Sequence, residues 1–419
     1  MDEFPGRSRS GLAGRREAGS AMTGPVLVYF PHNPCPPRTG AHRRCLQMLD
    51  GLVEIGARVH LASTRHFSDQ PWTEDAVGAL QARGLQHVWL HRRFRGQARL
   101  ERWEARYRGC DEWHFCSWWL RRWFEKLIHR LRPGSIVINY AVADQLLDHA
   151  RFVGIRRIME MPDLFSVNSQ MNAGLEQRIK HFVKTGRVGD LFDVDFHWGE
   201  RLKPAEKELA IYDQYNAVIA ISRREQALLK KHLRHVRVEW IPMHIPAIAC
   251  ENAYDAPPVF FASGNKFNQV GLLLLLNEVL RGVLAKCPDF QIDVVGDLGQ
   301  FAIPSRNVRY LGYVPDLSDV CRNAAFAICP VFAGTGQQVK IIEAMAHGLA
   351  VVAFRRAALA SPLRHGENGF IAEDIDQFAM CLVDLWRNRV LCRQLGTTAR
   401  ATLDAADSTA SALRSLVPI

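Results

Sequence analysis

The strongest constraint on the fold is an alternation of short apolar runs with helical patterns, which occurs twice along the chain. The first series of β-type runs is Val26–Phe30, Val59–Ala62, Val88–Leu90, Ile136–Asn139, Arg157–Met161 and Ala217–Ile221. The second is Val259–Ala262, Ile292–Val295, Val308–Leu311, Ala325–Cys329 and Ala350–Phe354. Helical patterns separate the runs, among them Ala41–Ile55, Asn268–Lys286, Asp316–Asn323, Gln337–His347 and Ile375–Arg387. Strands that alternate with helices in this way predict βαβ units and parallel sheets.

A proline-rich break divides the two series. Pro242, Pro246, Pro257 and Pro258 fall in a stretch without helical periodicity, which is typical of a segment that joins domains. We therefore predict an α/β protein with two doubly wound, Rossmann-like domains that face a cleft. The expected division is a disordered tail over 1–22, an N-terminal domain over 23–241, a linker over 242–258, a C-terminal domain over 259–400 and a helical tail over 401–419.

The composition excludes several classes of protein. The chain is 48% hydrophobic and 23% charged, which is typical of globular proteins rather than disordered or low-complexity ones. Its longest apolar run, Val270–Leu276, is much shorter than the roughly 20 residues of a membrane span. The 10 cysteines form no C-x-x-C pair and no zinc-type cluster, so we expect reduced thiols in a cytoplasmic protein.

The segment from Cys329 to Gly348 has the clearest chemical pattern. An apolar strand is followed by a loop with Gly334 and Gly336 and then by a helix that we expect to start near Gln337. Glycines before a helix allow a ligand to approach the backbone, and the N–H groups of a helix start favour an anion. Lys340 adds a positive charge, and Glu343 lies on the same helix face. This combination suits a nucleotide diphosphate together with its ribose.

Two structural interpretations compete with that one. Thr335 and Gln338 have the spacing of a capping box, and Lys340 and Glu343 could be a solvated pair on a helix surface. Two nucleotide-binding classes are excluded, because Val339 stands where a dinucleotide fingerprint has its third glycine and no P-loop motif occurs.

The same segment resembles the signature of retaining GT-B glycosyltransferases of family 4, the glycosyl transferases group 1. Those proteins have a helix that reads K-x-x-E-A-M-A-x-G-x-P-V-V after a glycine turn. Five further landmarks resemble the family in the expected order. They are Asn33–Gly40, Ala217–Ser222, Gly264–Asn268, Val294–Gly296 and Asn307–Val314. The similarity extends from about Pro25 to about Arg400.

This resemblance implies the roles of individual residues. Lys340 and Lys266 would act on the donor diphosphate as the catalytic cations, and Glu343 would bind the donor ribose. The other donor-binding residues implied are Gly40, Gly264, Asn265, Gly334, Thr335, Gly336 and Gln337. Thr335 stands where the family's E-x7-E motif has its first acid, so the contact of that acid with the donor sugar is missing. The resemblance further implies retention of anomeric configuration, with no cofactor and no metal.

Residues on the acceptor side are less well defined. Asp163 follows a predicted strand of the N-terminal half, where it could face the cleft or cap the next segment. His32 and Asn33 follow the first strand and could contact the acceptor or simply be hydrogen-bonded within their loop. A D-x-D pair at Asp193 and Asp195 is the alternative that would bind a metal.

A basic and aromatic segment lies between Trp89 and Arg132. It contains 12 Lys/Arg and 5 Asp/Glu, a net charge of +7, while the whole chain has a net charge of +10. Residues 91–113 favour an anionic membrane surface or a lipid phosphate. For 115–131 we favour a core helix over a helix on the bilayer. No nucleic-acid-binding motif occurs, so nucleic acid is not expected as a partner.

Together these observations predict a glycosyltransferase that moves a sugar from a nucleotide-sugar to a glycan or lipid-linked acceptor, in cell-surface polysaccharide synthesis. We expect it in the cytoplasm, with a peripheral position on the inner face of the membrane left open. Two alternatives remain: a GT-B-shaped isomerase or epimerase of the nucleotide-sugar, and a non-catalytic protein that binds nucleotide-sugars or a membrane surface.

Overall fold

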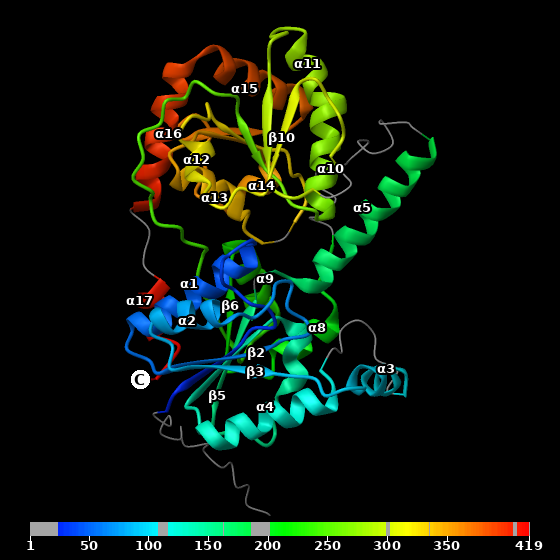
Figure 1. Cartoon of the computed structure of the whole chain (residues 1–419), viewed down its shortest axis with the longest axis vertical. Coiled ribbons are helices and arrows are strands. Elements are labelled where there is room, and N and C mark those ends of the chain that lie inside the picture. Colours follow the sequence, from blue (N-terminus) through cyan, green and yellow to red (C-terminus); the bar gives the residue numbers. More distant parts are fainter. Residues whose placement is uncertain are drawn as a thin grey trace, which may run out of the picture.

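The computed structural model describes residues 24–107, 116–161, 163–185, 202–298, 302–334, 336–404 and 409–418. It contains two parallel β-sheets, each covered by helices, in two domains that are stacked in Figure 1. The sequence prediction of two doubly wound α/β domains is confirmed. The predicted disordered tail lies outside the described residues.

The N-terminal sheet has seven strands in the order β3-β2-β1-β4-β5-β6-β7, all parallel. The strands are β1 (Val26–Tyr29), β2 (Val59–Thr64), β3 (His87–His91), β4 (Ser135–Asn139), β5 (Arg156–Met161), β6 (Ala217–Ala220) and β7 (Arg237–Trp240). The helices are α1 (Gly40–Glu54), α2 (Glu74–Ala82), α3 (Gln97–Tyr107), α4 (Trp118–Leu131), η1 (Ala141–Leu146), α5 (Phe165–Thr185), α8 (Glu206–Tyr212) and α9 (Arg223–His232). Sequence analysis missed β7, because this edge strand reads Arg-Val-Glu-Trp and has no apolar run.

The C-terminal sheet has six parallel strands in the order β10-β9-β8-β11-β12-β13. They are β8 (Val259–Phe261), β9 (Ile292–Val295), β10 (Val308–Gly312), β11 (Ala327–Cys329), β12 (Val351–Phe354) and β13 (Gly369–Ala372). The helices are α10 (Lys266–Leu274), a π-helical turn (Leu275–Val279), α11 (Leu280–Leu284), α12 (Ser318–Cys321), α13 (Val339–Ala346), α14 (Arg355–Ala358), α15 (Ile375–Arg387), α16 (Arg389–Asp404) and α17 (Thr409–Arg414). The predicted helix Asn268–Lys286 is therefore interrupted by the π turn, and β13 is a second edge strand that was missed.

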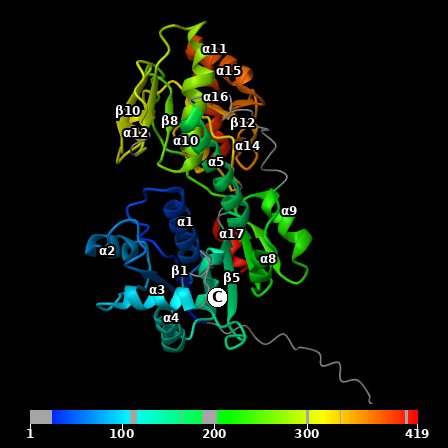
Figure 2. The same ribbon diagram turned by 90° about the vertical axis from the view of Figure 1, so that its right-hand side faces the viewer.

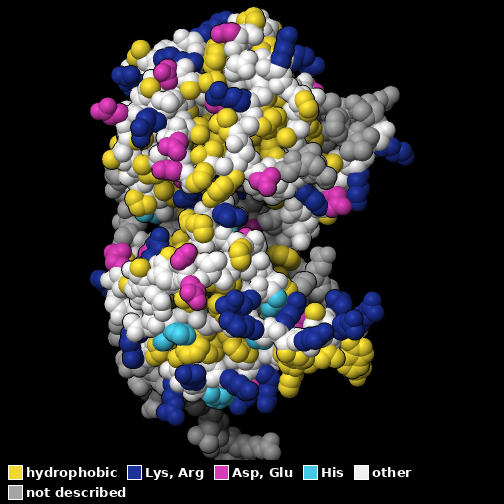
Figure 3. Space-filling model, in the orientation of Figure 1, with side chains coloured by type: hydrophobic (Ala, Val, Ile, Leu, Met, Phe, Trp, Pro, Cys, Tyr) yellow, Lys and Arg dark blue, Asp and Glu magenta, His cyan; other side chains and the backbone are white. Residues whose placement is uncertain are grey.

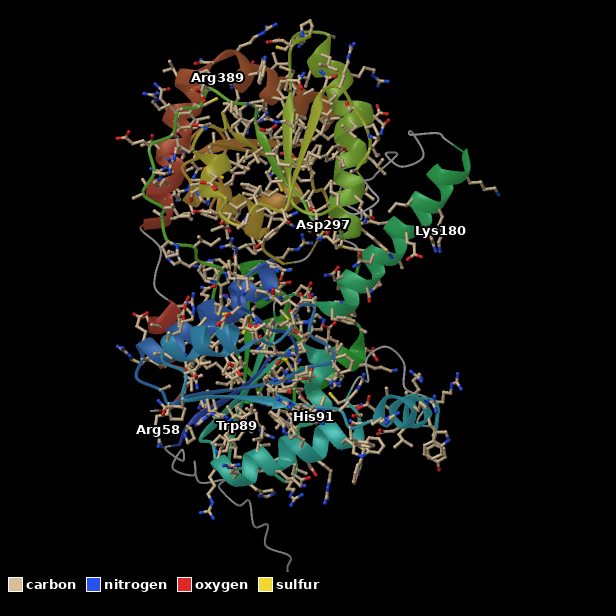
Figure 4. All side chains as sticks on the ribbon, viewed as in Figure 1. Arg58, Trp89, His91, Lys180, Asp297 and Arg389 are labelled. Carbon is tan, nitrogen blue, oxygen red and sulfur yellow. The ribbon has the colours of Figure 1, made fainter. Side chains whose placement is uncertain are left out.

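Both sheets reverse their strand order at one point, and these points locate the crevices where ligands bind in doubly wound folds. In the N-terminal sheet the reversal lies between β1 and β4, and in the C-terminal sheet it lies between β8 and β11. The carboxyl edge of the C-terminal sheet faces the N-terminal domain, as the position of Asp297 just after β9 shows in Figure 4.

The two domains are joined more closely than a single linker would require. Helix α5 rises from the N-terminal domain and contacts α10 of the other (Figure 2). A helix spans the predicted boundary at residue 400, and α17 then returns to pack against α1. The side chain of Gln47 donates to both Pro242 O, at 3.0 Å, and Thr409 Oγ1, at 2.5 Å. The C-terminal segment thus belongs to the core of the N-terminal domain, a long-range contact that no local sequence pattern indicates.

Two apolar helical segments, α4 and the run Lys266–Leu284, are packed within the domains. Helix α4 buries Leu120, Phe124, Leu127 and Ile128 under the sheet, so the core-helix interpretation of 115–131 is confirmed for Trp118–Leu131. Among the described residues, one helical run, Lys266–Leu284, has the length and apolar composition of a membrane span. It is 61% buried within the C-terminal domain, as core helices of globular domains commonly are.

Candidate functional site

The first donor-side loop lies at the carboxyl end of β8. Asn265 is the N-cap of α10, and its Oδ1 accepts a hydrogen bond from Asn268 N at 2.9 Å. Its amide group donates to Ser263 Oγ at 3.1 Å. A Cβ atom at Gly264 would make an ordinary van der Waals contact with Asp297 O at 3.7 Å, and Gly264 is exposed. Asn265 therefore holds the loop in shape, and the backbone around Gly264 is accessible to a ligand.

The second donor-side loop follows β11 and contains the two predicted glycines. Gly334 has φ 129°, a conformation that strongly favours glycine, and its N–H donates to Met171 Sδ of α5 at 3.3 Å. Gln337 Oε1 accepts from Met243 N of the interdomain linker at 2.6 Å. The loop is thus tied both to the N-terminal domain and to the linker.

The capping-box interpretation of this loop is wrong. Helix α13 starts at Val339, with Gln338 as its N-cap and no capping hydrogen bond from a side chain. The predicted start near Gln337 was two residues early, and Lys340 is consequently the second residue of the helix. Thr335 lies outside the described residues, so its predicted role stays a prediction.

Lys340 is positioned by the first turn of α10 and by β8. Its Nζ donates to Asn268 Oδ1 at 2.5 Å and lies 5.7 Å from the centre of the Phe260 ring. Burial lowers the pKa of Lys340 to about 7. A dianionic diphosphate beside this ammonium group would favour its charged form, so anion binding and protonation of Lys340 are coupled.

Lys266, the other predicted cation, is the first residue of α10. Its ammonium group forms an ion pair with Glu176 of α5, and hydrogen bonds from Lys180 and Lys266 lower the pKa of Glu176 to about 2. Asn268, which accepts the hydrogen bond from Lys340, lies two residues after Lys266 on α10. The two lysines therefore lie on neighbouring elements, α10 and α13, at the same switch point. Lys266 must exchange Glu176 for phosphate if it is to act on a donor.

Glu343 is buried and makes its contacts away from Lys340. Its carboxylate forms an ion pair with Arg43 Nε of α1 at 3.1 Å, and its other oxygen lies 3.5 Å from His347 Nε2. Its carboxylate is 6% exposed. The interpretation of Lys340 and Glu343 as a solvated surface pair is therefore wrong.

Gly40 lies where α1 of the N-terminal domain meets the start of α13 of the C-terminal domain. A Cβ atom at Gly40 would lie 2.9 Å from Val339 Cγ2, so any larger residue would separate α1 from the start of α13. The sequence prediction gave Gly40 a role in approaching phosphate. The structure adds a packing reason for glycine here, and the phosphate role stays a prediction.

The N-terminal crevice has a different character. His32 is 32% exposed and lies 3.8 Å from Asp69, which His42 holds at 3.0 Å. Asn33 is buried, and its side chain donates to Pro71 O and accepts from Cys35 N. The polar groups of Asn33 are thus used within the loop, which agrees with the alternative of a hydrogen-bonded loop residue.

Asp163 lies just after β5 and accepts a hydrogen bond from Asn168 Nδ2. Burial raises its pKa to about 6. Two further buried carboxyl groups were missed by sequence analysis, Glu208 and Glu225. Glu208 accepts from the N–H groups of Phe165 and Ser166, and burial raises the pKa of Glu225 to about 8. No sequence signal marks these acids, because they lie within ordinary helical patterns.

A pocket lies between the glycine loop and Glu225. It is lined from the N-terminal domain by Leu164, Val167, Leu202, Ser222, Arg224, Glu225 and Leu228, and from the C-terminal domain by Gly334, Gly336, Arg356, Leu359 and Ala360. The two faces of the cleft therefore meet next to the predicted donor loop. No group of three metal-ligating side chains occurs in the described ranges, and Asp193 and Asp195 lie outside them.

Comparison with known proteins agrees with this geometry. The family model described as "Glycosyl transferases group 1" matches residues 257–388, which contain both donor-side loops. The chain resembles the group 1 glycosyltransferases. Glycosyltransferase activity is supported by this match, which covers the domain that holds the donor-side lysines.

The whole fold is that of GT-B glycosyltransferases. Sucrose-phosphate synthase from Thermosynechococcus elongatus is 15% identical, with a TM-score of 0.60 over 91% of this chain and 94% of that one. Anabaena HepE in complex with UDP-glucose is 14% identical, with a TM-score of 0.58 over 94% and 98%. A mutant of S. aureus TarM in complex with fondaparinux, α-GlcNAc-glycerol and UDP is 11% identical, with a TM-score of 0.63 over 93% and 98%. Comparison with curated protein sequences found no significant match.

Proposed function

We propose that the protein transfers a sugar from a nucleotide-sugar to a glycan or lipid-linked acceptor, with retention of configuration and without a metal, in cell-surface polysaccharide synthesis. The observation that carries the proposal is the pair of lysines at the C-terminal switch point, Lys266 and Lys340, next to two glycine-containing loops. Two cations beside the start of a helix suit a diphosphate.

The donor would lie across the carboxyl ends of β8 and β11. Its ribose would reach Glu343, which must then exchange Arg43 for the ribose hydroxyls. Two of the structurally similar proteins are described in complexes with UDP or UDP-glucose, so uridine nucleotides are the first donors to test.

Sugar transfer from a nucleotide-sugar requires stabilisation of the leaving diphosphate rather than a side-chain nucleophile. Negative charge increases on the diphosphate as the glycosidic bond breaks, and Lys340, Lys266 and the start of α13 would stabilise it. Because burial lowers the pKa of Lys340 to about 7, we expect donor binding to take up a proton near that pH.

One observation favours a different stereochemical outcome. His32 beside Asp69 could act as a general base on the acceptor, which would invert the anomeric centre. The 3.8 Å separation of this pair is too long for a hydrogen bond, while His42 holds the same carboxylate at 3.0 Å. His32 is therefore not oriented as a base, and we favour retention.

A panel of UDP-, GDP-, ADP- and dTDP-sugars tests the activity. Release of free nucleotide, accelerated by acceptor extracts, is expected for one base. Isomerised sugar still attached to its nucleotide would indicate the epimerase, and thermal stabilisation without turnover would indicate a binding protein. Full activity in excess EDTA is expected, and strict dependence on a divalent cation would contradict the metal-free mechanism. NMR of the product anomer decides between retention and inversion.

The acceptor is proposed to be membrane-associated because of the exposed surface of α3. Gln97 is the one residue of α3 that is buried. Leu100, Trp103 and Tyr107 form an exposed apolar stripe, with Trp103 67% and Tyr107 81% exposed. Figure 3 shows basic and hydrophobic side chains together at the lower right, over this helix.

A second stripe of α3, at Arg99, Arg102 and Arg106, is exposed beside the apolar one. A helix with adjoining apolar and arginine faces is typical of attachment to an anionic bilayer. Each arginine near such a surface contributes about 1 kcal/mol. A peripheral position on the inner face of the membrane would give the enzyme access to a lipid-linked acceptor, which is why we favour that acceptor class.

A further inference from the structure

Tyr140 has an unusual backbone at the N-terminal switch point. It follows β4 directly and has φ 71° and ψ 132°, a conformation that residues with a side chain rarely adopt. Surrounding contacts hold it there: its N–H donates to Glu160 O at 3.1 Å, and its carbonyl oxygen accepts from Ala143 N at 2.9 Å. Residues held in this way cluster at binding and catalytic sites.

The position of Tyr140 is that of a ligand-binding residue. It follows β4 where the chain leaves the sheet beside the end of β1, at the reversal of strand order. Its ring stacks on Phe30, with ring centres 6.2 Å apart and planes at 28°. Phe30 also meets His32 edge-on, with ring centres 5.6 Å apart. Phe30 itself is 1% exposed and belongs to the core, so it supports the partly exposed side chains of Tyr140 and His32.

The hydroxyl group of Tyr140 is an available hydrogen-bond donor. Among the residues that the structure describes, it makes no hydrogen bond. Burial, together with the negative charge of Asp163, raises the pKa of Tyr140, so the phenol stays protonated at neutral pH. Asp163, whose charge acts on Tyr140, supplies a carboxylate acceptor near it. A hydrogen-bond donor and an acceptor side by side suit the hydroxyl groups of a sugar ring.

We propose that Tyr140 positions the acceptor sugar, with its hydroxyl donating to an acceptor hydroxyl group. The inference rests on the proposed function for its reaction, and on the surroundings of Tyr140 alone for its binding site. The stacking on the buried Phe30 fixes the orientation of the Tyr140 ring.

A second tyrosine provides a matched control. Tyr254 also has a positive φ, of 59°, but it lies in the C-terminal domain, where its hydroxyl donates to Gly348 O at 2.9 Å. Tyr254→Phe removes the same atom from a position with a purely structural hydrogen bond. Thermal unfolding of both variants shows whether the fold is intact.

The test has two readouts. Saturation-transfer NMR with a panel of methyl glycosides measures sugar binding, and acceptor-independent nucleotide release from the donor measures the donor site. In Tyr140→Phe we expect about 10-fold weaker glycoside binding, or an about 10-fold higher KM for the acceptor, with unchanged nucleotide release. Tyr254→Phe should bind glycosides as the wild type does.

The outcomes separate the two proposals. In the first outcome the protein releases nucleotide, and Tyr140→Phe binds glycosides as the wild type does. This result overturns the role of Tyr140 and leaves the glycosyltransferase proposal in place. In the second outcome glycoside binding depends on Tyr140, but no donor releases nucleotide. This result supports the role of Tyr140 and overturns the glycosyltransferase proposal. No glycoside binding by the wild-type protein overturns the inference.

Discussion

The two switch points of this molecule have the same architecture and opposite chemistry. The C-terminal one presents Lys266 and Lys340 on glycine-containing loops, while the N-terminal one presents aromatic rings and the carboxyl group of Asp163. The first suits a diphosphate, and the second suits a neutral group with hydroxyls. The fold thus provides two equivalent crevices, and the residues after their strands decide which substrate each one binds.

The largest effect should follow from removing the cation at the C-terminal crevice. In Lys340→Ala we expect kcat to fall about 100- to 1000-fold, because the charge on the leaving diphosphate is greatest in the transition state. Steady-state kinetics with a saturating donor measures this. Lys286→Ala, which removes an exposed cation of the same domain, should retain wild-type rates. Equal kcat values in both variants would contradict the assignment of Lys340.

The second largest effect should be on membrane attachment, which we expect to depend on the N-terminal domain alone. Arg93 already pairs with Glu101, so the sharper variant replaces Arg99, Arg102 and Arg106 by Ser. We expect a loss of about 3 kcal/mol in affinity for anionic vesicles, seen as loss of flotation at low salt. Replacing the exposed Lys230, Lys231 and Arg234 changes the net charge equally and should leave flotation unchanged. Equal losses would mean that net charge, rather than α3, governs the attachment.

Substitutions at the donor ribose site should have smaller effects. The variants of Glu343 and Arg43 should change nucleotide affinity in opposite directions. Glu343→Gln should weaken nucleotide binding by about 1.5–3 kcal/mol, because a charged acceptor is lost. Arg43→Ala should strengthen it slightly, since Glu343 is then released from its interdomain ion pair. Isothermal titration with the nucleotide that the panel identifies measures both. The same sign in both variants would indicate that the Arg43–Glu343 pair is a structural contact.

The smallest effect concerns stability near the N-terminal crevice. Burial raises the pKa of Glu225 to about 8, so the folded state retains a proton that the unfolded state has released. The free energy of unfolding should therefore fall as the pH rises from 6 to 8, by at most about 1.4 kcal/mol per pH unit from this group.

Glu225→Gln keeps the neutral shape of the side chain and should reduce this slope, as measured by urea unfolding at pH 6, 7 and 8. The exposed Glu74→Gln serves as the control and should keep the wild-type slope. An unchanged slope in Glu225→Gln would show that Glu225 is ionised throughout this range.

The sequence predicted one crevice better than the other for a physical reason. Donor residues lie at the ends of apolar strands or in the first turn of the helices that follow, so Gly334 and Lys340 could be named from local pattern. Gly264 and Lys266 could be named from the family resemblance. Tyr140, Glu208 and Glu225 acquire their environment from segments distant in the chain, and no local pattern marks them. The ion pairs of Lys266 with Glu176 and of Glu343 with Arg43 also connect the two domains, so a linear pattern could not reveal them.

The return of α17 to the N-terminal domain has a consequence for the order of folding. Ala410, Leu413, Leu416 and Val417 belong to the same apolar cluster as Leu49 and Leu52 of α1. During synthesis the first domain leaves the ribosome with this face of α1 uncovered until α17 emerges. We therefore expect its completion to wait for the whole second domain, so that a nascent chain lacking the final turn would expose apolar surface to chaperones and proteases.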